Sequence, residues 1–366
     1  MAQWIWEQAE WPKFRWDIQA LMPKLRQVYT LLGHLRGTLS TLGLRTELDT
    51  ALSAMTADVI SSSEIEGVLL DPAQVRSSVA TRLGLATEGL PTASHYIDRL
   101  VDIMMHACQH ADTPLSHEML WEYHRNLFPA GGPHVGCYRH SAETMRVISG
   151  RIGQETVHFE APPTERVLDM MEAFIQWVNA QNEIDPILKA GIASLWFVTI
   201  HPFSDGNGRL SRTLTDKLLA QVDQMPQRFY SMTATIQKKR TSYYQILETT
   251  QHGNMDITLW LSWFLECLSE AIQNALLEIQ QTVQCARFWD VHHSIAFNLR
   301  QKRILQRFME PFEGKLTTSK YAKMAKCSTD TALRDLQELV SLEILKIEGI
   351  GRGTHYVWHP SAWHTQ

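Results

Sequence analysis

A short polar stretch, HPFSDGNGRLSR at residues 201–212, brings together the residue types that phosphoryl-group chemistry needs. Gly206 and Gly208 lack a Cβ, so backbone N–H groups beside them can approach an anion closely. The leucine stripe that follows predicts a helix, whose N-terminus adds unpaired donors and positive dipole character. We therefore expect Gly206, Asn207 and Gly208 to form a phosphate cradle.

The other residues of this stretch supply the remaining parts of such a site. Arg209 and Arg212 are three residues apart and share a helix face, where both guanidinium groups could hold one polyphosphate. Asp205 offers a hard oxygen ligand for Mg²⁺. His201, as a neutral imidazole, could take a proton from an attacking hydroxyl. Each residue alone has an ordinary structural explanation, but their conjunction favours phosphoryl-type transfer; a Walker A loop is excluded because its GK[ST] is absent.

Helices must position these residues, and helical spacing dominates the chain to about residue 290. The Asp-Pro pairs that begin at Asp71 and Asp185 each predict a helix start, with the aspartate as N-cap and the proline in the first turn. Between residues 138 and 163, β-branched and aromatic residues flank a glycine-containing turn and predict a β-hairpin. The expected fold is mainly α with one hairpin on the helical domain.

The beginning of the chain is rich in tryptophan. We expect this segment to form a small aromatic cap that includes a short hairpin. The tryptophans are Trp4, Trp6, Trp11 and Trp16.

The end of the chain, from residue 291, has the order helix, helix-turn-helix, glycine-rich hairpin, which predicts a winged helix. Its third helix is expected to bury one apolar face. The residues of that face are Leu333, Leu336, Leu339 and Val340. The predicted domains are therefore residues 1–106, 107–290 and 291–366.

Composition sets broad limits on function. The 366 residues are 44% hydrophobic and carry a net charge of -5, which argues against a generally basic, nucleic-acid-binding surface. The five cysteines have no CxxC spacing, which fits free thiols in a reducing compartment. The sequence has no apolar run long enough for a signal peptide or a membrane span. We expect a soluble, cytoplasmic protein.

The stretch at residues 201–212 resembles the signature of the Fic family, a histidine followed by an acidic residue, GNG and two arginines. The resemblance implies a helical Fic core over about residues 107–269 and transfer of AMP from ATP, with Mg²⁺, to a Ser, Thr or Tyr hydroxyl of a protein. It makes His201 the general base and Asp205 the Mg²⁺ ligand. It also assigns the α- and β-phosphates to residues 206–208 and the charge clamp to Arg209 and Arg212.

An upstream segment, Ser62-Ser63-Glu64-Ile65-Glu66-Gly67, resembles the inhibitory motif of some Fic proteins. Glu66 matches the inhibitory glutamate, and Ser62 matches the Ser or Thr four residues before it. A carboxylate that pairs with Arg212 would occupy the guanidinium that the γ-phosphate needs. The alternative is that Glu66 is solvated and Gly67 simply ends the helix.

The resemblance also suggests how substrates are held. The hairpin over residues 145–159 corresponds to the family's flap, which aligns a target hydroxyl through backbone pairing. Of the adjacent Tyr243 and Tyr244, at most one is expected to face a given pocket, and Tyr244 is chosen for the adenine side. A core tyrosine or a plain surface hairpin would explain these segments equally well.

The partner expected from the resemblance is a protein with a hydroxyl side chain, with self-modification and a homodimer left open. From residue 300 on, the chain contains eleven Lys and Arg but only seven Asp and Glu, and this local excess of positive charge leaves DNA binding open. Acidic residues on the presumed recognition helix, Asp330, Asp335 and Glu338, disfavour it. The basic candidates are Lys320, Lys323, Lys326, Arg334 and Arg352.

Other functions are compatible with the same sequence. The same site could remove AMP from a modified protein, with Glu66 orienting water. Alternatively, the chain could be a DNA-binding regulator whose Fic core senses a nucleotide. The Fic fold also supports transfer of UMP, phosphocholine or phosphate, but the intact signature with a glutamate motif favours ATP.

Overall fold

The computed structural model describes residues 3–363, apart from residues 142, 143, 152, 153, 182, 226, 310, 311 and 313. For residues 151, 154, 155 and 352 it describes the backbone only. The chain divides into two compact units, Met1–Leu276 and Leu277–Gln366. A further division of the first unit near residue 106 stays a prediction.

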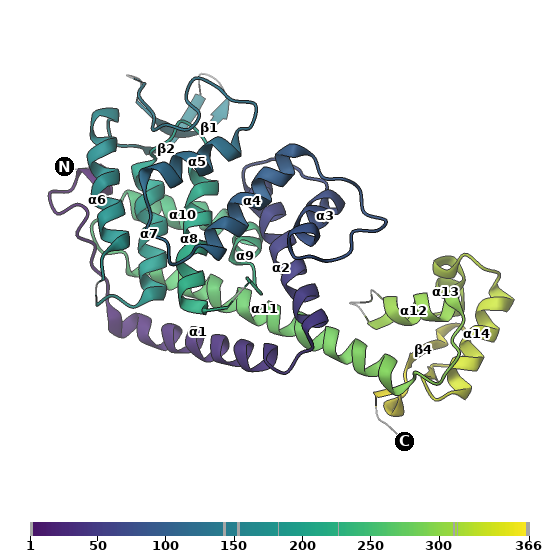
Figure 1. The fold of residues 1–366 in the computed structure, drawn as a ribbon. Coiled ribbons are helices and arrows are strands. Elements are labelled where there is room, and N and C mark those ends of the chain that lie inside the picture. The colour runs from purple at the N-terminus through teal and green to yellow at the C-terminus, as the bar shows by residue number, and fades with distance from the viewer. Residues whose placement is uncertain are drawn as a thin grey trace. The chain divides into compact units, whose positions relative to one another are not determined.

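The first unit is mainly helical, as predicted (Figure 1). Its helices in chain order are α1 (Ile18–Leu39), α2 (Leu44–Ile65), α3 (Pro72–Arg82), α4 (His95–Gln109), α5 (His117–Leu127), α6 (Val167–Asn179), α7 (Pro186–Ile200), α8 (Asn207–Asp223), α9 (Met232–Lys238), α10 (Arg240–Gln251) and the beginning of α11 (Thr258–Val291). The two predicted Asp-Pro starts are confirmed, because Asp71 caps α3 and Asp185 caps α7 through their side chains.

Helices α7 and α8 form the centre of the first unit. Every residue of α7 from 190 to 200 is buried, which requires close neighbours on all sides. The neighbour on one side is α11, where the Trp260 Nε1–H donates to the Gly191 carbonyl at 2.8 Å. On another side Ser211 of α8 donates its hydroxyl to the Ser194 carbonyl at 3.1 Å. This packing fixes the end of α7 and the start of α8, between which the predicted phosphate stretch lies.

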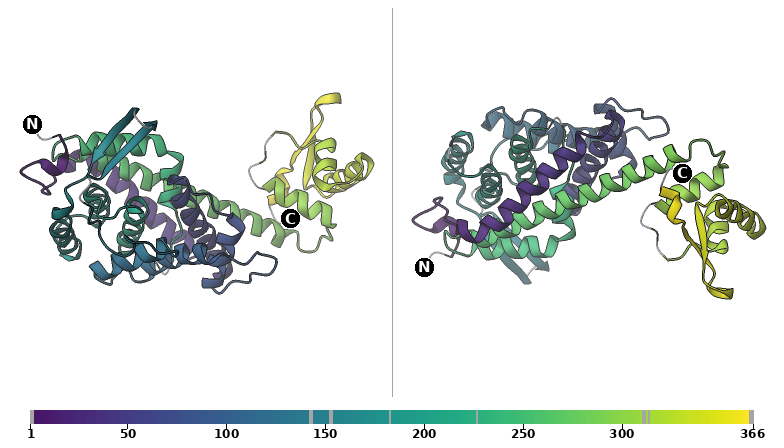
Figure 2. Two further views of the ribbon diagram at one scale, coloured as in Figure 1. Left: turned by 90° about the horizontal axis from the view of Figure 1, so that it is seen from above. Right: turned by 90° about the horizontal axis from the view of Figure 1, so that it is seen from below.

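A long helix pair supports this centre from outside. Figure 2 shows α1 running beside the first part of α11, and the Lys24 ammonium contacts Ser262 and Glu266 across the pair. Leucine and valine side chains of α1 are buried at helical spacing. The pair thereby covers one side of the α7–α8 core.

The predicted hairpin is confirmed as the antiparallel pair β1 (Arg146–Arg151) and β2 (Gln154–Glu160), and its turn residues 152 and 153 lie outside the described residues. The N-terminal segment packs on the base of this hairpin, where the Trp6 indole N–H donates to the Glu160 carbonyl at 2.7 Å. The segment forms a 3₁₀ turn over Ile5–Glu7. The expected N-terminal hairpin is therefore wrong, because tryptophan packing on β2 replaces pairing within the segment.

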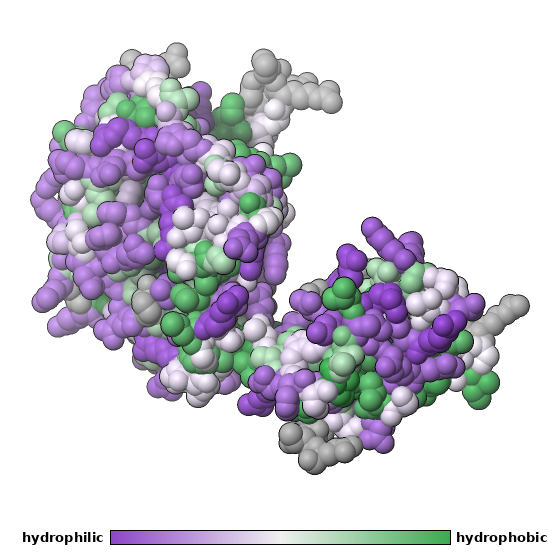
Figure 3. Space-filling view, turned by 45° about the vertical axis from the view of Figure 1, so that its right-hand side comes forward, coloured by the Kyte–Doolittle hydropathy of each residue, from purple (hydrophilic) through white to green (hydrophobic). Residues whose placement is uncertain are grey.

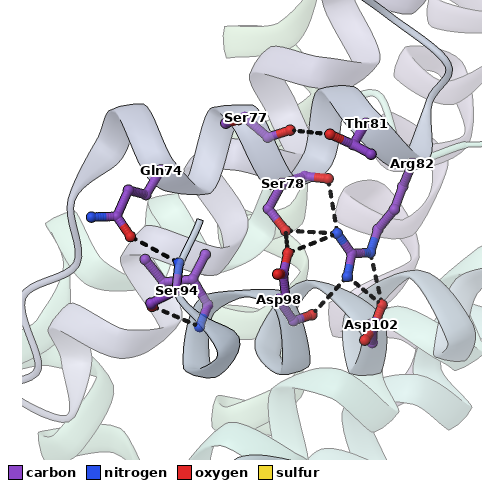
Figure 4. A network of polar contacts seen from close by, with 9 residues as sticks. Gln74, Ser77, Ser78, Thr81, Arg82, Ser94, Asp98 and Asp102 are labelled. Carbon is purple, nitrogen blue, oxygen red and sulfur yellow. Dashed lines mark hydrogen bonds and ion pairs between the residues drawn. The ribbon is translucent and has the colours of Figure 1, made fainter. Parts of the chain in front are cut away.

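Helices α3 and α4 are joined into one block by polar contacts (Figure 4), and this block packs against α2. Arg82 of α3 lies between the carboxylates of Asp98 and Asp102 on α4, at 3.1 and 2.7 Å. Ser78 donates to the same Asp98 carboxylate. The block holds the end of α2, where Gly67 takes a positive φ of 78° and stops the helix as predicted.

The second unit contains α12 (Leu299–Met309), α13 (Thr318–Ala325), α14 (Thr329–Ser341) and the antiparallel strands β3 (Leu345–Glu348) and β4 (His355–Trp358). Leu336 and Leu339 are fully buried, but Leu333 is 39% exposed and Ala332 takes its place in the core. The expected position of Leu333 is therefore wrong, because it lies about 100° around the helix from Ala332. The identification as a winged helix stays a prediction.

One acidic residue of the presumed recognition helix α14 lies inside the unit. Asp335 is buried and accepts hydrogen bonds from the Arg300 guanidinium and the Tyr321 hydroxyl, so it belongs to the core of the unit. The expectation that Asp335 opposes DNA from the surface of this helix is therefore wrong, because its carboxylate is paired inside the unit. Lys323, Lys326 and Arg334 are exposed, Lys320 lies over the Phe312 ring, and the side chain of Arg352 lies outside the described part.

Hydrophilic residues cover most of the face of the first unit seen in Figure 3, with apolar residues in small groups. Within the described residues, no helix has both the length and the apolar character that crossing a bilayer requires.

Candidate functional site

The end of α7 presents His201 in an unusual backbone conformation. His201 follows the last turn with φ 50° and ψ 59°, the left-handed region that glycine or asparagine usually occupies at this place. Arg139 fixes this corner, because its Nε–H donates to the His201 carbonyl at 2.8 Å and its backbone N–H to the Pro202 carbonyl at 2.9 Å. The chain therefore leaves α7 at His201 in a backbone conformation that is unfavourable for a residue with a side chain.

The protonation state of His201 follows from its neighbours. Its Nδ1 lies 3.3 Å from the Val198 carbonyl oxygen, which can only accept, so Nδ1 carries the proton and Nε2 keeps its lone pair. Burial lowers the pKa of His201 to about 4. At neutral pH the ring is therefore uncharged and able to accept a proton at Nε2.

Asn207 acts mainly on the loop rather than on a ligand. Its side chain is 2% exposed, accepts from the Phe203 N–H at 2.9 Å and donates to the Phe203 carbonyl at 2.8 Å. Both polar atoms of the buried amide therefore help to close the loop. Any part of Asn207 in the predicted cradle must come from its backbone N–H at the start of α8.

The loop is also held by His124, which the sequence did not single out. The His124 ring stacks on Phe203 at 4.2 Å; its Nδ1 accepts from the Gly136 N–H and its Nε2–H donates to the Asp205 carbonyl. Burial lowers the pKa of His124, which favours this neutral, doubly bonded ring. His124 and Arg139 are 77 and 62 positions from His201 in the chain, and neither lies in a motif that could have revealed it.

The start of α8 already faces a carboxylate. A Cβ built on Gly208 would overlap with Oε1 of Glu66, so only glycine leaves room for that oxygen. The first N–H groups of a helix have no partner within the helix and attract negative charge. The space next to Gly208 therefore accommodates an anionic group, and here it holds the carboxylate of Glu66.

Arg212 binds the same segment of α2. Its Nη2–H donates to Glu66 Oε1 at 2.7 Å and to the Ser62 carbonyl at 3.0 Å, and its Nε–H donates to the Ser62 hydroxyl at 3.1 Å. Arg212 is 4% exposed, whereas the Glu66 side chain is 32% exposed. The predicted contact between Glu66 and Arg212 is present, through one guanidinium nitrogen rather than as a bidentate pair.

Arg209 makes different contacts from Arg212. Its guanidinium lies over the Phe128 ring at 5.0 Å, and its Nη1–H donates to the Tyr96 hydroxyl at 3.3 Å. Asp205, with its side chain 74% exposed, has Oδ2 3.9 Å from Arg209 Nη2 and accepts from the Gly206 N–H at Oδ1. A nucleotide role for Arg209 stays a prediction.

A cavity of about 700 Å³ joins these elements. The end of α2, the hairpin, α7, α8 and α10 all contribute to it, and its lining includes Glu66, His201, Gly208 and Arg212. Both Tyr243 and Tyr244 also line it, the first buried and the second 41% exposed. The expectation that only one tyrosine would face the pocket is wrong, because the cavity extends around two sides of α10.

The hairpin side of the cavity carries a polar chain of contacts that the sequence did not reveal. His158 of β2 contacts the Ser149 hydroxyl of β1 at 2.6 Å and the Glu248 carboxylate of α10 at 3.0 Å. All three residues line the cavity. They are separated in sequence, and only the strand register and the position of α10 bring them together.

Comparisons with known proteins agree with this arrangement. Residues 114–219 match the model of the Fic/DOC family, and residues 4–85 match that of a domain of unknown function (DUF4172). The chain is similar to the protein adenylyltransferase Fic of Drosophila grimshawi, with 26% identity over 265 residues that cover 70% of this chain and 50% of that protein. It is also similar to the protein adenylyltransferase Fic of Culex quinquefasciatus, with 28% identity over 223 residues that cover 58% of this chain and 40% of that protein. The chain thus spans half or less of the length of these relatives.

Among solved structures, a Fic family protein from Desulfovibrio desulfuricans G20 superposes with a TM-score of 0.53 and 19% identity, covering 93% of this chain and 96% of that chain. This likeness shows a shared fold. The resemblance to the Fic family is confirmed for the domain and the fold.

Proposed function

We propose that this chain is a protein adenylyltransferase that moves AMP from ATP to a protein hydroxyl and is held inactive by Glu66. The observation that carries the proposal is the single cavity onto which His201, Gly208 and Arg212 all open. The relatives named protein adenylyltransferase support the same reaction class.

Binding of the triphosphate follows from the anion site at the start of α8. That site accommodates the Glu66 carboxylate, so its geometry and charge suit an oxyanion. With Glu66 withdrawn, the backbone of residues 206–208 and the Arg212 guanidinium would face the phosphates instead. Tyr244, on the exposed rim of the cavity, is our candidate for stacking on the adenine.

The chemistry assigned to His201 is general-base catalysis. A hydroxyl of the target attacks the α-phosphorus, its proton passes to His201 Nε2, and pyrophosphate leaves with the bonding electrons. Arg212 stabilises the negative charge of the leaving phosphates.

Asp205 would supply the protein ligand for Mg²⁺. Its carboxylate is largely exposed, and no cluster of three or more metal-ligating side chains occurs among the described residues. Such a donor set fits Mg²⁺, which keeps waters and phosphate oxygens and needs few carboxylates. When bound, the ion would offset phosphate charge in the transition state.

The inhibitory role proposed for Glu66 follows from competition for Arg212. The carboxylate and a γ-phosphate need the same guanidinium and the same space above Gly208. ATP could then bind only in a pose in which the α-phosphorus is not aligned for attack by the target hydroxyl. Release requires the end of α2 to move or Glu66 to rotate toward solvent.

A protein substrate is favoured by the hairpin. β1 and β2 form a two-stranded sheet, and among the described residues no further strand pairs with either, so an edge could pair with an extended target segment. Val147, Ile148 and Val157 are exposed there and offer an apolar surface. Backbone pairing would place a target hydroxyl over the cavity.

Labelling with ATP carrying the isotope at the α- or the γ-phosphate tests this proposal. We expect the Glu66→Gly protein, with Mg²⁺ and cell lysate, to label lysate proteins from α-labelled ATP and not from γ-labelled ATP. The wild type should label weakly, and the Glu66→Gly/His201→Ala protein should not label them. Transfer of the γ-label would identify a kinase instead, and equal labelling by the His201→Ala variant would refute the assigned base.

A further inference from the structure

Arg139 joins two parts of the chain that meet beside the cavity. The residue is buried, with 5% of its surface exposed. On one side its Nε–H donates to the His201 carbonyl at 2.8 Å, and an Nη2–H donates to the Ile200 carbonyl at 3.4 Å. These two carbonyls belong to the end of α7 and to the corner that carries the proposed base.

The other side of the same guanidinium holds the foot of the hairpin. An Nη2–H donates to the carbonyl of Pro162, which follows the end of β2, and an Nη1–H donates to the Thr164 hydroxyl at 3.1 Å. Thr164 in turn donates its hydroxyl to the carbonyl of Ser141, in the segment that leads into β1, at 2.8 Å. Both chain segments at the foot of the hairpin are therefore tied to one planar group, and through it to His201.

A positive charge is an unfavourable group to bury at this junction. The hydrogen-bond partners of the Arg139 side chain are carbonyl oxygens and one hydroxyl, and no carboxylate is among them in the described part of the chain. Burial accordingly lowers the pKa of Arg139. A neutral donor could join two segments without the free-energy cost of an uncompensated charge. What arginine adds is a rigid fork that fixes several acceptors in one plane.

The charge of Arg139 also acts on the imidazole of His201. Burial is the main reason that the pKa of His201 falls to about 4, and the positive charge of Arg139 adds to this lowering. The carboxylates of Glu66 and Asp205 act on the same ring in the opposite direction. Arg139 therefore helps to keep the imidazole neutral while it fixes the backbone that carries the ring.

We propose that Arg139 is a positioning residue for AMP transfer, which sets the distance between His201 and the hairpin that presents the target hydroxyl. The inference rests on the proposed function. Arg139 is not among the described residues that line the cavity, so it acts through His201 and the foot of the hairpin. A base must lie within hydrogen-bond reach of the attacking hydroxyl, and a displacement of about 1 Å can slow such a reaction about 10²-fold.

The first test separates positioning from nucleotide binding, in the Glu66→Gly protein as parent, with α-labelled ATP, Mg²⁺ and lysate. Arg139→Lys keeps a positive charge but loses the planar fork, so it should slow the labelling of lysate proteins by about 10- to 10²-fold. Its affinity for an ATP analogue with a methylene group between the α- and β-phosphates, measured by calorimetry, should stay close to that of the parent. Arg146→Lys is the matched control, because Arg146 of the same hairpin pairs with Glu160 at the surface, and it should label at the parent rate.

The second test separates the two sides of the junction. Thr164→Val removes one acceptor at the foot of the hairpin and keeps the bonds to α7, so it should slow labelling less than Arg139→Lys and leave the titration of His201 unchanged. Arg139→Met removes the charge, which should raise the pKa of His201 toward its ordinary value. Proton–carbon NMR of histidine-labelled protein measures this titration without any AMP transfer, and the signal of His201 is the one that is missing from His201→Ala.

Labelling at the parent rate in Arg139→Lys overturns the inference, and so does a loss of analogue affinity that matches the loss of labelling. If Arg139→Lys unfolds at the assay temperature, Thr164→Val decides: slower labelling with the analogue affinity of the parent supports the inference, and the parent rate overturns it. A His201 titration that does not move in Arg139→Met refutes the contact between the guanidinium and the base. Absence of all label in the parent overturns the proposed function and this inference with it, whereas a labelled parent with equally active variants overturns this inference alone.

Discussion

Helix α8 carries an arginine–carboxylate contact near each of its ends, and the two are built differently. Toward the C-terminal end, Asp216 and Asp223 hold Arg228, with Asp216 Oδ1 2.8 Å from Nη2 and Asp223 Oδ2 3.5 Å from Nη1. All three are at most 5% exposed. Toward the N-terminal end, Arg212 is equally buried, but the carboxylate of Glu66 comes from the end of α2 and reaches solvent.

This difference separates a contact that holds the fold from one that can open. Removing one partner of a fully buried pair leaves an uncompensated charge inside, which the folded state tolerates poorly. A carboxylate that is already partly hydrated can leave its partner at much lower cost. The Arg212 guanidinium also lies beside the Tyr243 hydroxyl, so the buried part of this arginine stays in place when Glu66 leaves.

The largest effect on activity is expected for His201, which lies close to the N-terminal end of α8 and takes part in neither ion pair. In the Glu66→Gly background, His201→Ala should slow AMP transfer to lysate proteins by about 10²- to 10⁴-fold, because the base is lost. The unfolding midpoint should stay close to that of the parent. A large fall in that midpoint would show that His201 supports the fold instead.

The next largest effect is expected when the buried contact of Arg228 with Asp216 and Asp223, near the C-terminal end of α8, is broken. Arg228→Met should lower the free energy of unfolding by about 3–5 kcal/mol, because two buried carboxylates lose their counter-charge. Denaturant unfolding of wild type and variant measures this. Arg45→Ala is the control, because Arg45 and its partner Asp49 are largely exposed, and its effect should stay within about 0.5 kcal/mol.

A smaller effect is expected when the contact between Glu66 and Arg212, near the N-terminal end of α8, is broken. Glu66→Gly should raise the rate of AMP transfer by about 10- to 10²-fold, since a charge-assisted hydrogen bond contributes about 1.5–3 kcal/mol. Glu64→Gly, two residues earlier in α2, should leave the rate at the wild-type level. If both variants raise the rate equally, loosening of α2 rather than release of Arg212 is the cause.

The smallest effect is expected when the pH is changed near neutrality, where the rate of AMP transfer should hardly vary. Because burial lowers the pKa of His201 to about 4, the neutral base is present above that pH and is lost as the pH falls through it. The initial rate of the Glu66→Gly protein should therefore be nearly flat from about pH 6 to pH 8, where an ordinary histidine would lose half its activity near pH 6.5. A halving near pH 6.5 would contradict the buried, neutral ring.

Local sequence patterns predicted local structure well. The caps at Asp71 and Asp185, the stop at Gly67 and the strands of the hairpin were all found, because each depends on residues within one or two turns of chain. The resemblance to Fic motifs also predicted that Glu66 would reach Arg212. Predictions failed where a side chain depends on partners distant in sequence, as for Asp335, which accepts from Arg300 in the second unit.

The sequence by itself determined the helices, the glycine-containing start of α8 and the set of groups at residues 201–212. Only the tertiary structure decided that the Asn207 side chain closes its own loop and that His124 and Arg139 hold that loop. It also decided that Ser149, His158 and Glu248 meet on one wall of the cavity. The physical reason is that helix propensity and capping act over a few residues, whereas burial and hydrogen-bond satisfaction depend on groups that approach only when the whole unit has packed.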